Sequence, residues 1–182
     1  MPVSEKSKKV AMATSRARGA VGVRAIVPQI VKEFAMPHYT ILDFGSGKEP
    51  AHAEVLRHAG HNVTAHDYHA VPGVHDENAL KRRYDLVYAS NVLNVQDTRK
   101  ALASTLNDIA GAVKPNGGIG ILNFPDNPRK GIFSQMNPLD AVAHVERAIR
   151  RRFKIVERHP RGNANNPIWI VKEPKYFPKK SQ

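Results

Sequence analysis

Short apolar segments alternate with amphipathic ones along most of the chain, and this alternation predicts an α/β fold. The apolar segments have the length of buried strands, whereas the segments between them repeat apolar residues at helical spacing. Strands that alternate with helices in this way are typical of βαβ units around a parallel sheet. The predicted strands are residues 40–44, 62–65, 84–90, 119–124, 153–158 and 168–171, and the predicted helices are 16–34, 51–59, 98–113 and 138–152.

Three local features refine this outline. Pro28 falls inside the first helical pattern and predicts a break near Val27, while Gly60 is placed to end the second helix. Residues 74–80 are irregular and hold either a short strand near Val74 or a helical turn. The last two strands are close enough to pair antiparallel. We therefore expect a Rossmann-like, mostly parallel sheet of about seven strands, with an antiparallel C-terminal strand and helices on both faces.

The length of 182 residues fits one domain. We expect a polar arm over residues 1–15, a single domain over 16–173 and a basic tail over 174–182. The chain has no cysteine, which excludes disulfides, thiolate metal sites and cysteine nucleophiles. No apolar run reaches the roughly 18–20 residues of a membrane span, and no apolar segment follows the lysine-rich start. We therefore expect a cytoplasmic protein with no membrane partner.

The strongest local signal is a glycine turn between a strand and a helix, Ile41-Leu-Asp-Phe-Gly-Ser-Gly-Lys-Glu49. Gly45 and Gly47 allow positive φ and close approach of a ligand, and the helix N-terminus beyond them offers N–H groups. Asp67 ends the next strand, 20 residues after Gly47. An acid at about that spacing can accept the ribose hydroxyls of a nucleoside. These features together predict a nucleoside site at the turn.

Four motifs, in this order, resemble those of the class I S-adenosylmethionine (SAM)-dependent methyltransferase superfamily over roughly residues 38–172. Leu42-Asp-Phe-Gly-Ser-Gly47 is similar to the first motif, and Val63-Thr-Ala-His-Asp67 to the ribose-binding motif. Tyr84-Asp-Leu-Val-Tyr-Ala-Ser-Asn91 resembles the fourth strand, and Val113-Lys-Pro-Asn-Gly-Gly118 the turn before the fifth. The chain departs from the family at Glu49, which stands where a third glycine or an alanine is usual.

The resemblance implies that SAM is the cofactor. It places Asp43 near the methionine amino group, Asp67 at the ribose and Asp76 at the adenine amino group, with Glu49 near the methionine moiety. The residues implied in cofactor binding are Asp43, Phe44, Gly45, Ser46, Gly47, Glu49, Asp67, Tyr68, His75, Asp76, Ser90 and Asn91. No metal is expected, because the ribose site already accounts for the acid and histidines around Asp67.

Two amide-rich segments follow strands and are candidates to meet the methyl acceptor. They supply Asn91 and Asn94 after the third clear strand and Asn123 after the fourth, and we predict these three as catalytic residues. Loop capping is the alternative role for both segments. The first segment lacks the Pro-Pro and aromatic residues of nucleic-acid amino-methyltransferases, and without cysteine, addition to cytosine C5 is excluded. Candidate general bases are His66, His69, His75 and Asp126.

The charge is concentrated at the two ends of the chain. The net charge of +12 divides into +5 over residues 1–24, −2 over 25–146 and +9 over 147–182. Basic ends attract polyanions, which predicts a nucleic acid as acceptor and partner. The predicted contacts are Arg16, Arg18, Arg150, Arg151, Arg152, Lys179 and Lys180.

Three alternatives remain open: a small-molecule or protein acceptor, a non-catalytic SAM- or nucleic-acid-binding module, and, more distantly, a nicotinamide dehydrogenase. The dehydrogenase would want a third glycine where Pro50 stands. The arginines at the end of the last predicted helix have an equally ordinary explanation, which is that they are solvated on an exposed helix face.

Overall fold

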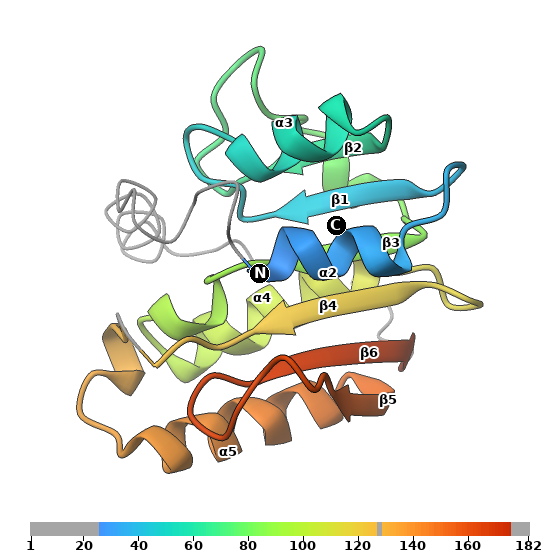
Figure 1. The fold of residues 1–182 in the computed structure, drawn as a ribbon. Coiled ribbons are helices and arrows are strands. Elements are labelled where there is room, and N and C mark those ends of the chain that lie inside the picture. Colours follow the sequence, from blue (N-terminus) through green and yellow to red (C-terminus); the bar gives the residue numbers. More distant parts are fainter. Residues whose placement is uncertain (1–25, 127–128, 176–182) are drawn as a thin grey trace.

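A central sheet is covered by two helices on each face in the computed structural model, which describes residues 26–126 and 129–175 (Figure 1). Its six strands lie in the order β2-β1-β3-β4-β6-β5. They are β1 (Thr40–Phe44), β2 (Asn62–His66), β3 (Leu86–Ala89), β4 (Ile119–Asn123), β5 (Phe153–Arg158) and β6 (Ile168–Pro174). The helices are α2 (Ile26–Phe34), α3 (Ala51–His58), α4 (Arg99–Ala112) and α5 (Pro138–Arg150). Three short 3-10 turns are η2 (Ala79–Lys81), η3 (Leu93–Val95) and η4 (Gly131–Phe133).

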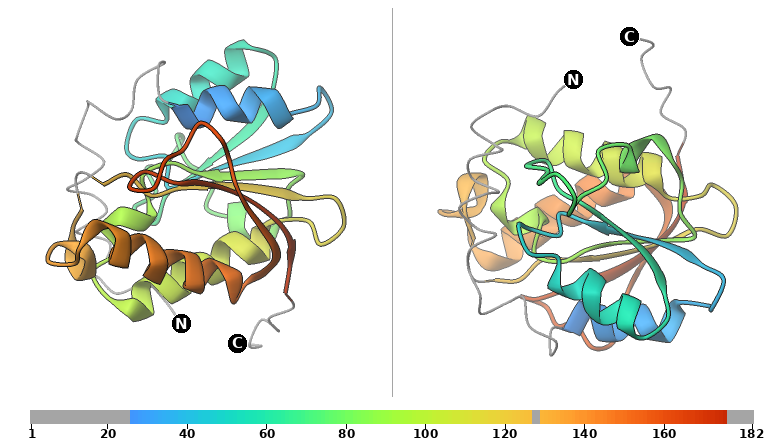
Figure 2. Two further views of the ribbon diagram at one scale, coloured as in Figure 1. Left: turned by 60° about the horizontal axis from the view of Figure 1, so that its bottom comes forward. Right: turned by 90° about the horizontal axis from the view of Figure 1, so that it is seen from above.

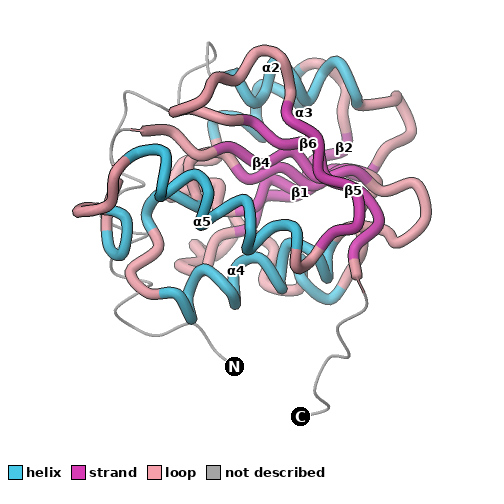
Figure 3. Tube along the Cα trace, turned by 90° about the horizontal axis from the view of Figure 1, so that it is seen from below, coloured by secondary structure: helices cyan, strands magenta, loops and turns pink. Residues whose placement is uncertain are grey.

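The predicted α/β class and strand directions are confirmed. Strands β1 to β4 run parallel, and β6 lies antiparallel between β4 and β5. Helices α2 and α3 cover one face, and α4 and α5 cover the other (Figures 2 and 3). Each crossover thus carries its helix to a definite face, as expected for right-handed βαβ units.

The predicted seventh strand is absent from the described residues. Pro72 has no N–H to donate and Gly73 turns the backbone at φ +78°, so residues 74–80 run past the sheet without forming a ladder. Only the amide of Asp76 reaches the neighbouring strand, where it donates to the carbonyl of Ala65 (3.0 Å). Arg57 Nε donates to the carbonyl of Val63 (2.9 Å), so the edge of β2 is capped at both positions.

The first predicted helix is described from Ile26 onward. Within this part α2 is continuous from Ile26 to Phe34, and Pro28 is among its buried residues. The rest of the predicted helix and the arm lie outside the described residues, as does the tail from residue 176. Among the described helices, none is long and apolar enough to cross a membrane.

Alternation along β1 sends successive side chains to opposite faces of the sheet. Ile41 joins the core beneath α2 and α3, whereas Leu42 and Phe44 join the larger core beneath α4 and α5. Asp43 therefore belongs to the α3 side, and it lies in register with Tyr88 of β3. The strand that carries the glycine turn thus buries one acidic side chain among apolar neighbours.

The Tyr-Asp entry to β3 has a structural role. The carboxylate of Asp85 accepts hydrogen bonds from the amide (2.9 Å) and hydroxyl (2.7 Å) of Thr40, and from Nζ of Lys114 (2.6 Å). Burial alone would raise the pKa of Asp85, but these contacts lower it to about 2. This clamp fixes the starts of β1 and β3 and the turn before β4, at the edge of the sheet opposite the carboxyl ends of the parallel strands.

Candidate functional site

The chain reverses its direction of winding between β1 and β3. From β1 it crosses to β2 on one side, and it later returns to place β3 on the other side of β1. Ligand sites of open α/β sheets form in the crevice at the carboxyl ends of the strands at such a point. The glycine turn, Asp67 and the Asn91 loop all follow carboxyl ends here. The topology therefore brings the predicted motifs to one edge of the sheet.

The glycine turn is anchored to the end of β2. The amides of Gly45 and Ser46 both donate to the carbonyl of His66 (2.8 and 3.0 Å), and Gly45 and Gly47 have φ of +76° and +74°. A Cβ at Gly45 would lie 2.5 Å from Cγ2 of Val92, which belongs to the loop after β3. Both backbone conformation and space thus require glycine at position 45.

Asp67 fixes the turn as well as facing it. Its Oδ2 accepts from the amide of Gly47 (3.0 Å), and its Oδ1 accepts from the amide of His69 (2.9 Å). Because a carboxylate offers about four acceptor positions, two remain for a ligand. His75 braces the other side: its Nε2 donates to the carbonyl of Gly47 (2.8 Å), and its Nδ1 accepts from the amide of Val71 (2.8 Å). His75 therefore supports the turn through its backbone.

Asp43 lies buried behind the turn and is 2% exposed. Burial raises its pKa to about 7, and the charge of nearby Asp67 adds to this, whereas Tyr88, Arg57 and the amide of Ala53 oppose it. Neither Oδ2 of Asp43 nor the hydroxyl of Tyr88 makes a hydrogen bond of standard geometry within the described residues. At pH 7 the buried Asp43 is therefore only partly ionised, and a cation beside the turn would favour its charged form.

Three aromatic rings pack on the α4 side of this edge. The ring of Phe44 lies 5.3 Å from that of His66 and 5.6 Å from that of Tyr68, whose hydroxyl donates to Asp108 (2.7 Å). Burial lowers the pKa of His66 to about 4, so its imidazole is neutral at pH 7. The side chain of Phe44 is 1% exposed, which leaves only its main chain to meet a ligand.

Two other predicted cofactor residues are differently placed. Asp76 forms an ion pair with Arg82 and accepts from the amide of Asn78 (2.7 Å), so its carboxylate already has partners. The side chain of Glu49 is exposed at the far end of the turn. Their roles toward adenine and methionine remain predictions.

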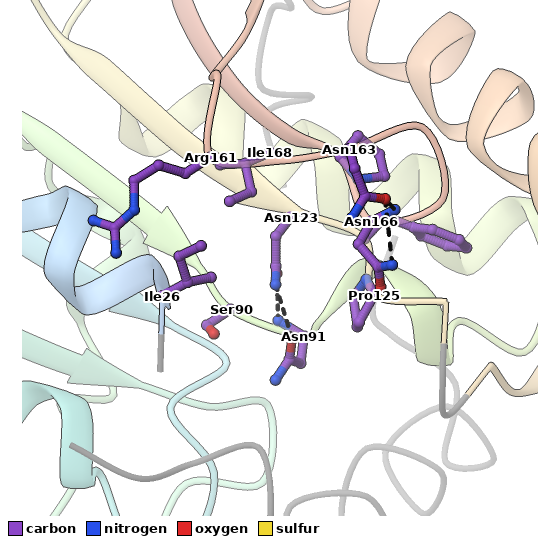
Figure 4. Close-up of a pocket in the computed structure, with 11 residues that line it drawn as sticks. Ile26, Ser90, Asn91, Asn123, Pro125, Arg161, Asn163, Asn166 and Ile168 are labelled. Atoms are coloured by element: carbon purple, nitrogen blue, oxygen red, sulfur yellow. Dashed lines mark hydrogen bonds between the residues drawn. The ribbon is translucent and has the colours of Figure 1, made fainter. Parts of the chain in front are cut away.

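Asn91 and Asn123 face one another across the ends of β3 and β4 (Figure 4). Oδ1 of Asn123 accepts from the amide of Asn91 (2.7 Å), and Nδ2 of Asn123 donates to Oδ1 of Asn91 (2.9 Å). Asn91 has φ of +60°, a left-handed conformation that is unusual outside glycine. Asn94, by contrast, is 1% exposed within η3 and is not among the residues that line the pocket beside this pair, so its catalytic role stays a prediction.

A pocket of about 300 Å³ opens beside the asparagine pair (Figure 4). Its polar lining is Ser90, Asn91, Asn123, Arg161, Asn163 and Asn166. Its apolar lining is Ile26, Phe124, Pro125, Pro167 and Ile168. The sequence reasoning missed the contribution of the β5–β6 loop, although its Arg-Gly-Asn-Ala-Asn-Asn-Pro run is a visible amide-rich signal.

The predicted nucleic-acid contacts are only partly available on the described surface. Arg150 is bonded to Glu146 (2.8 Å), and Arg152 to Asn107 (3.0 Å), while Arg151 is exposed. Arg16, Arg18, Lys179 and Lys180 lie outside the described residues. Within the described ranges, no three His, Cys, Asp or Glu side chains form a group able to hold a metal ion.

Solved structures with the same architecture are SAM-dependent methyltransferases. A TehB-like enzyme from Corynebacterium glutamicum is 14% identical, with 91% of this chain and 98% of that chain covered and a TM-score of 0.57. One from Bacteroides fragilis, solved with S-adenosylhomocysteine, is 15% identical over 83% and 78%, with a TM-score of 0.55. The chain has the fold of the class I SAM-dependent methyltransferases.

A third similar structure is the 1,6-didemethyltoxoflavin-N1-methyltransferase of Burkholderia thailandensis, solved with bound 1,6-didemethyltoxoflavin and S-adenosylhomocysteine. It is 18% identical over 97% of this chain and 93% of that chain, with a TM-score of 0.52. No protein-family model matches the chain, and no curated protein matches it. The likeness to this methyltransferase fold thus rests on structure rather than on sequence.

Proposed function

We propose that the chain is a SAM-dependent methyltransferase. The observation that carries this proposal is the pairing of Asp43 and Asp67 behind and beside the Gly45–Gly47 turn. Net positive charge on the protein would favour anions, yet this turn presents carboxylates. Such a site suits a ligand that carries positive charge, as the sulfonium and ammonium groups of SAM do, better than the pyrophosphate of a dinucleotide.

The residues present fit such a ligand in three places. Asp67 keeps two acceptor positions for ribose hydroxyls, and the glycine turn leaves no side chain between the backbone and a ligand. Asp43 is buried behind the turn, and a cation bound beside it would favour its charged form. When bound, SAM supplies a methyl group on a positively charged sulfur, and this sulfur is a leaving group that needs no acid–base help. The protein's remaining task is to hold an acceptor in line, which the pocket beside Asn91 is placed to do.

Calorimetry with S-adenosylhomocysteine and SAM tests the donor half of the proposal. We expect wild-type protein to bind both, and Asp67→Asn to bind at least tenfold more weakly because the variant loses the negative charge while keeping an acceptor oxygen. Glu77→Gln, an exposed change in the following loop, is the matched control and should bind as wild type does. Absence of binding by folded wild-type protein would overturn the proposal.

We further propose a nucleic acid as the methyl acceptor. Support comes from the net charge of +12 and from Arg99, Arg147 and Arg151, which surround His144 and lack an acidic partner among residues 26–126 and 129–175. Burial lowers the pKa of His144, and these three cations lower it further. We therefore infer that phosphates approach this face of α4 and α5, with Arg151 kept as a contact and Arg99 and Arg147 in place of Arg150 and Arg152.

Tritiated SAM incubated with DNA, RNA, protein and metabolite fractions tests the acceptor. Label in DNA or RNA, together with binding that weakens steeply as salt rises, is the expected result. Label confined to protein or to acid-soluble metabolites would refute the nucleic-acid acceptor and leave the methyltransferase proposal standing. SAM binding without label in any fraction would favour a non-catalytic module.

A further inference from the structure

The pocket beside the asparagine pair is nearly neutral despite the basic character of the protein. None of its lining residues is acidic, and its single cation, Arg161, is bonded to Glu33 (2.9 Å) and Gln29 (2.5 Å) of α2. The rest of the polar lining consists of one hydroxyl and four side-chain amides. A charged ligand would find no unpaired opposite charge in this lining, so the lining favours a neutral one.

The orientation of the amides gives the pocket a preference for acceptors. Oδ1 of Asn123 is occupied by the amide of Asn91, and Oδ1 of Asn166 by the amide of Asp126 (2.8 Å). Oδ1 of Asn163 accepts from the amides of Asn165 (3.0 Å) and Asn166 (2.9 Å). Each of these oxygens already accepts at least one hydrogen bond from the protein, so the less used NH₂ groups are what these side chains chiefly offer a ligand.

The NH₂ groups are only partly used. That of Asn123 gives one hydrogen to Asn91, that of Asn166 makes one long contact with Asn163 (3.5 Å), and that of Asn163 has no partner in the described parts of the chain. Each NH₂ group carries two donors, so each of the three keeps at least one hydrogen for a ligand. A complementary ligand therefore carries carbonyl oxygens or ring nitrogens along one edge.

Size and apolar lining complete the description. A pocket of about 300 Å³ is at the small end of ligand sites, enough for one ring system and not for a polymer. Ile26, Phe124 and Ile168 offer apolar surface for the faces of a ring. Such a ring would lie beside Asn91, whose loop carries Val92 onto the glycine turn.

We infer that this pocket receives a neutral, planar heterocycle whose edge carries carbonyl or ring-nitrogen acceptors, as a nucleobase does. The inference rests on the proposed function in one respect: it identifies this heterocycle with the group that is methylated. For a nucleic-acid acceptor, one unpaired or extruded base at a time would enter.

Titration of isotope-labelled protein by NMR tests the inference, with uridine, adenosine and nicotinamide as probes and benzoate and benzylamine as charged controls. We expect the three neutral heterocycles to shift the side-chain NH₂ signals of Asn123, Asn163 and Asn166, and the charged controls to bind at least tenfold more weakly. Equal binding of benzoate or benzylamine, or no shift of these signals with any heterocycle, would overturn the inference.

A pocket-filling variant separates this result from the donor site. Ile26→Trp at the start of α2 should weaken heterocycle binding at least tenfold while leaving the affinity for S-adenosylhomocysteine unchanged. Phe34→Trp, at the other end of the same helix, should change neither. Heterocycle binding without S-adenosylhomocysteine binding would refute the proposed function alone, whereas the reverse would refute only the pocket assignment.

Discussion

Asn123 holds Asn91 in a left-handed backbone conformation through two hydrogen bonds, one to its amide and one to its side chain. The next residue, Val92, packs against Gly45 in the turn after β1. The end of β4 is thus connected to the glycine turn through two consecutive residues of the loop after β3. A change at Asn123 is expected to reach both the acceptor pocket and the turn.

We predict that Asn123→Ala lowers the free energy of unfolding by about 1–3 kcal/mol, because it leaves the amide of Asn91 without its partner and releases a strained residue. Urea denaturation measures the loss. Asn91→Gly in the Asn123→Ala background should recover part of it, since glycine adopts φ near +60° without strain. Recovery equal to that from Asn91→Ala would show that the backbone conformation is not what Asn123 stabilises.

Gly45→Ala should destabilise the fold more than Gly60→Ala. Both positions have positive φ, which costs an alanine about 1–2 kcal/mol, but only position 45 adds a contact with Val92. At Gly60 nothing lies within 4 Å of an added Cβ. Thermal denaturation compares the two variants. Val92→Ala should relieve much of the excess in the Gly45→Ala background, and an unchanged excess would contradict the contact.

Asp43→Asn should stabilise the protein at high pH. The pKa of Asp43 in the folded state is about 7, above its ordinary value of 3.8. The folded state therefore holds this proton more tightly than the unfolded state does. As a result, Asp43 does not reduce the free energy of unfolding below pH 4, and it reduces that energy as the pH rises through 7. Compared with wild type, the variant should gain about 1–3 kcal/mol at pH 8 and nothing at pH 4, in denaturation series across this range. The same variant should bind SAM more weakly, and a gain independent of pH would refute the raised pKa.

Glu146→Gln should destabilise the protein at neutral pH and lose its effect in acid. Burial would raise the pKa of Glu146, but bonds from Arg150 (2.8 Å), Arg158 (2.6 Å) and Trp169 (3.1 Å) lower it to about 2. The stability it contributes is present above pH 4.5 and is lost as the pH falls toward 2. We expect a loss of about 1–3 kcal/mol at pH 7 that shrinks below pH 4.5.

Glu157→Gln is the control for this series, because Glu157 is exposed on β5 and also neutralises one negative charge. It should change stability little at any pH. A comparable loss in both variants would mean that net charge, rather than the contacts of Glu146, is responsible.

Periodicity predicted most of the fold because each element carries its own local signal. Helix α4 begins at the cap Thr98 and α5 at Asn137 followed by Pro138, within a residue of where the pattern placed them. The turn between β1 and α3 was predictable because positive φ selects glycine. For residues 74–80 a strand and a helical turn both stayed open, because one apolar residue, Val74, is too little to distinguish them; the structure has the turn, as η2.

The site beyond the turn was less predictable because it depends on distant pairings. Asn91 and Asn123 are 32 residues apart, and nothing local indicates that their amides meet. Arg161 reaches α2 across more than a hundred residues, so its neutralisation by Glu33 depends on the tertiary fold and has no local signal in the sequence. Likewise, consecutive arginines at 150–152 look equivalent in sequence, but only the fold shows that two of them are already bonded.

The capped edge of β2 has a consequence for how copies of the chain meet. The carbonyls of Val63 and Ala65 already accept hydrogen bonds from Arg57 and Asp76, so a strand from another molecule would have to displace both. The arginine and the passing loop therefore act as a barrier to edge-to-edge association and fibre growth at a margin where the sheet would otherwise end unprotected.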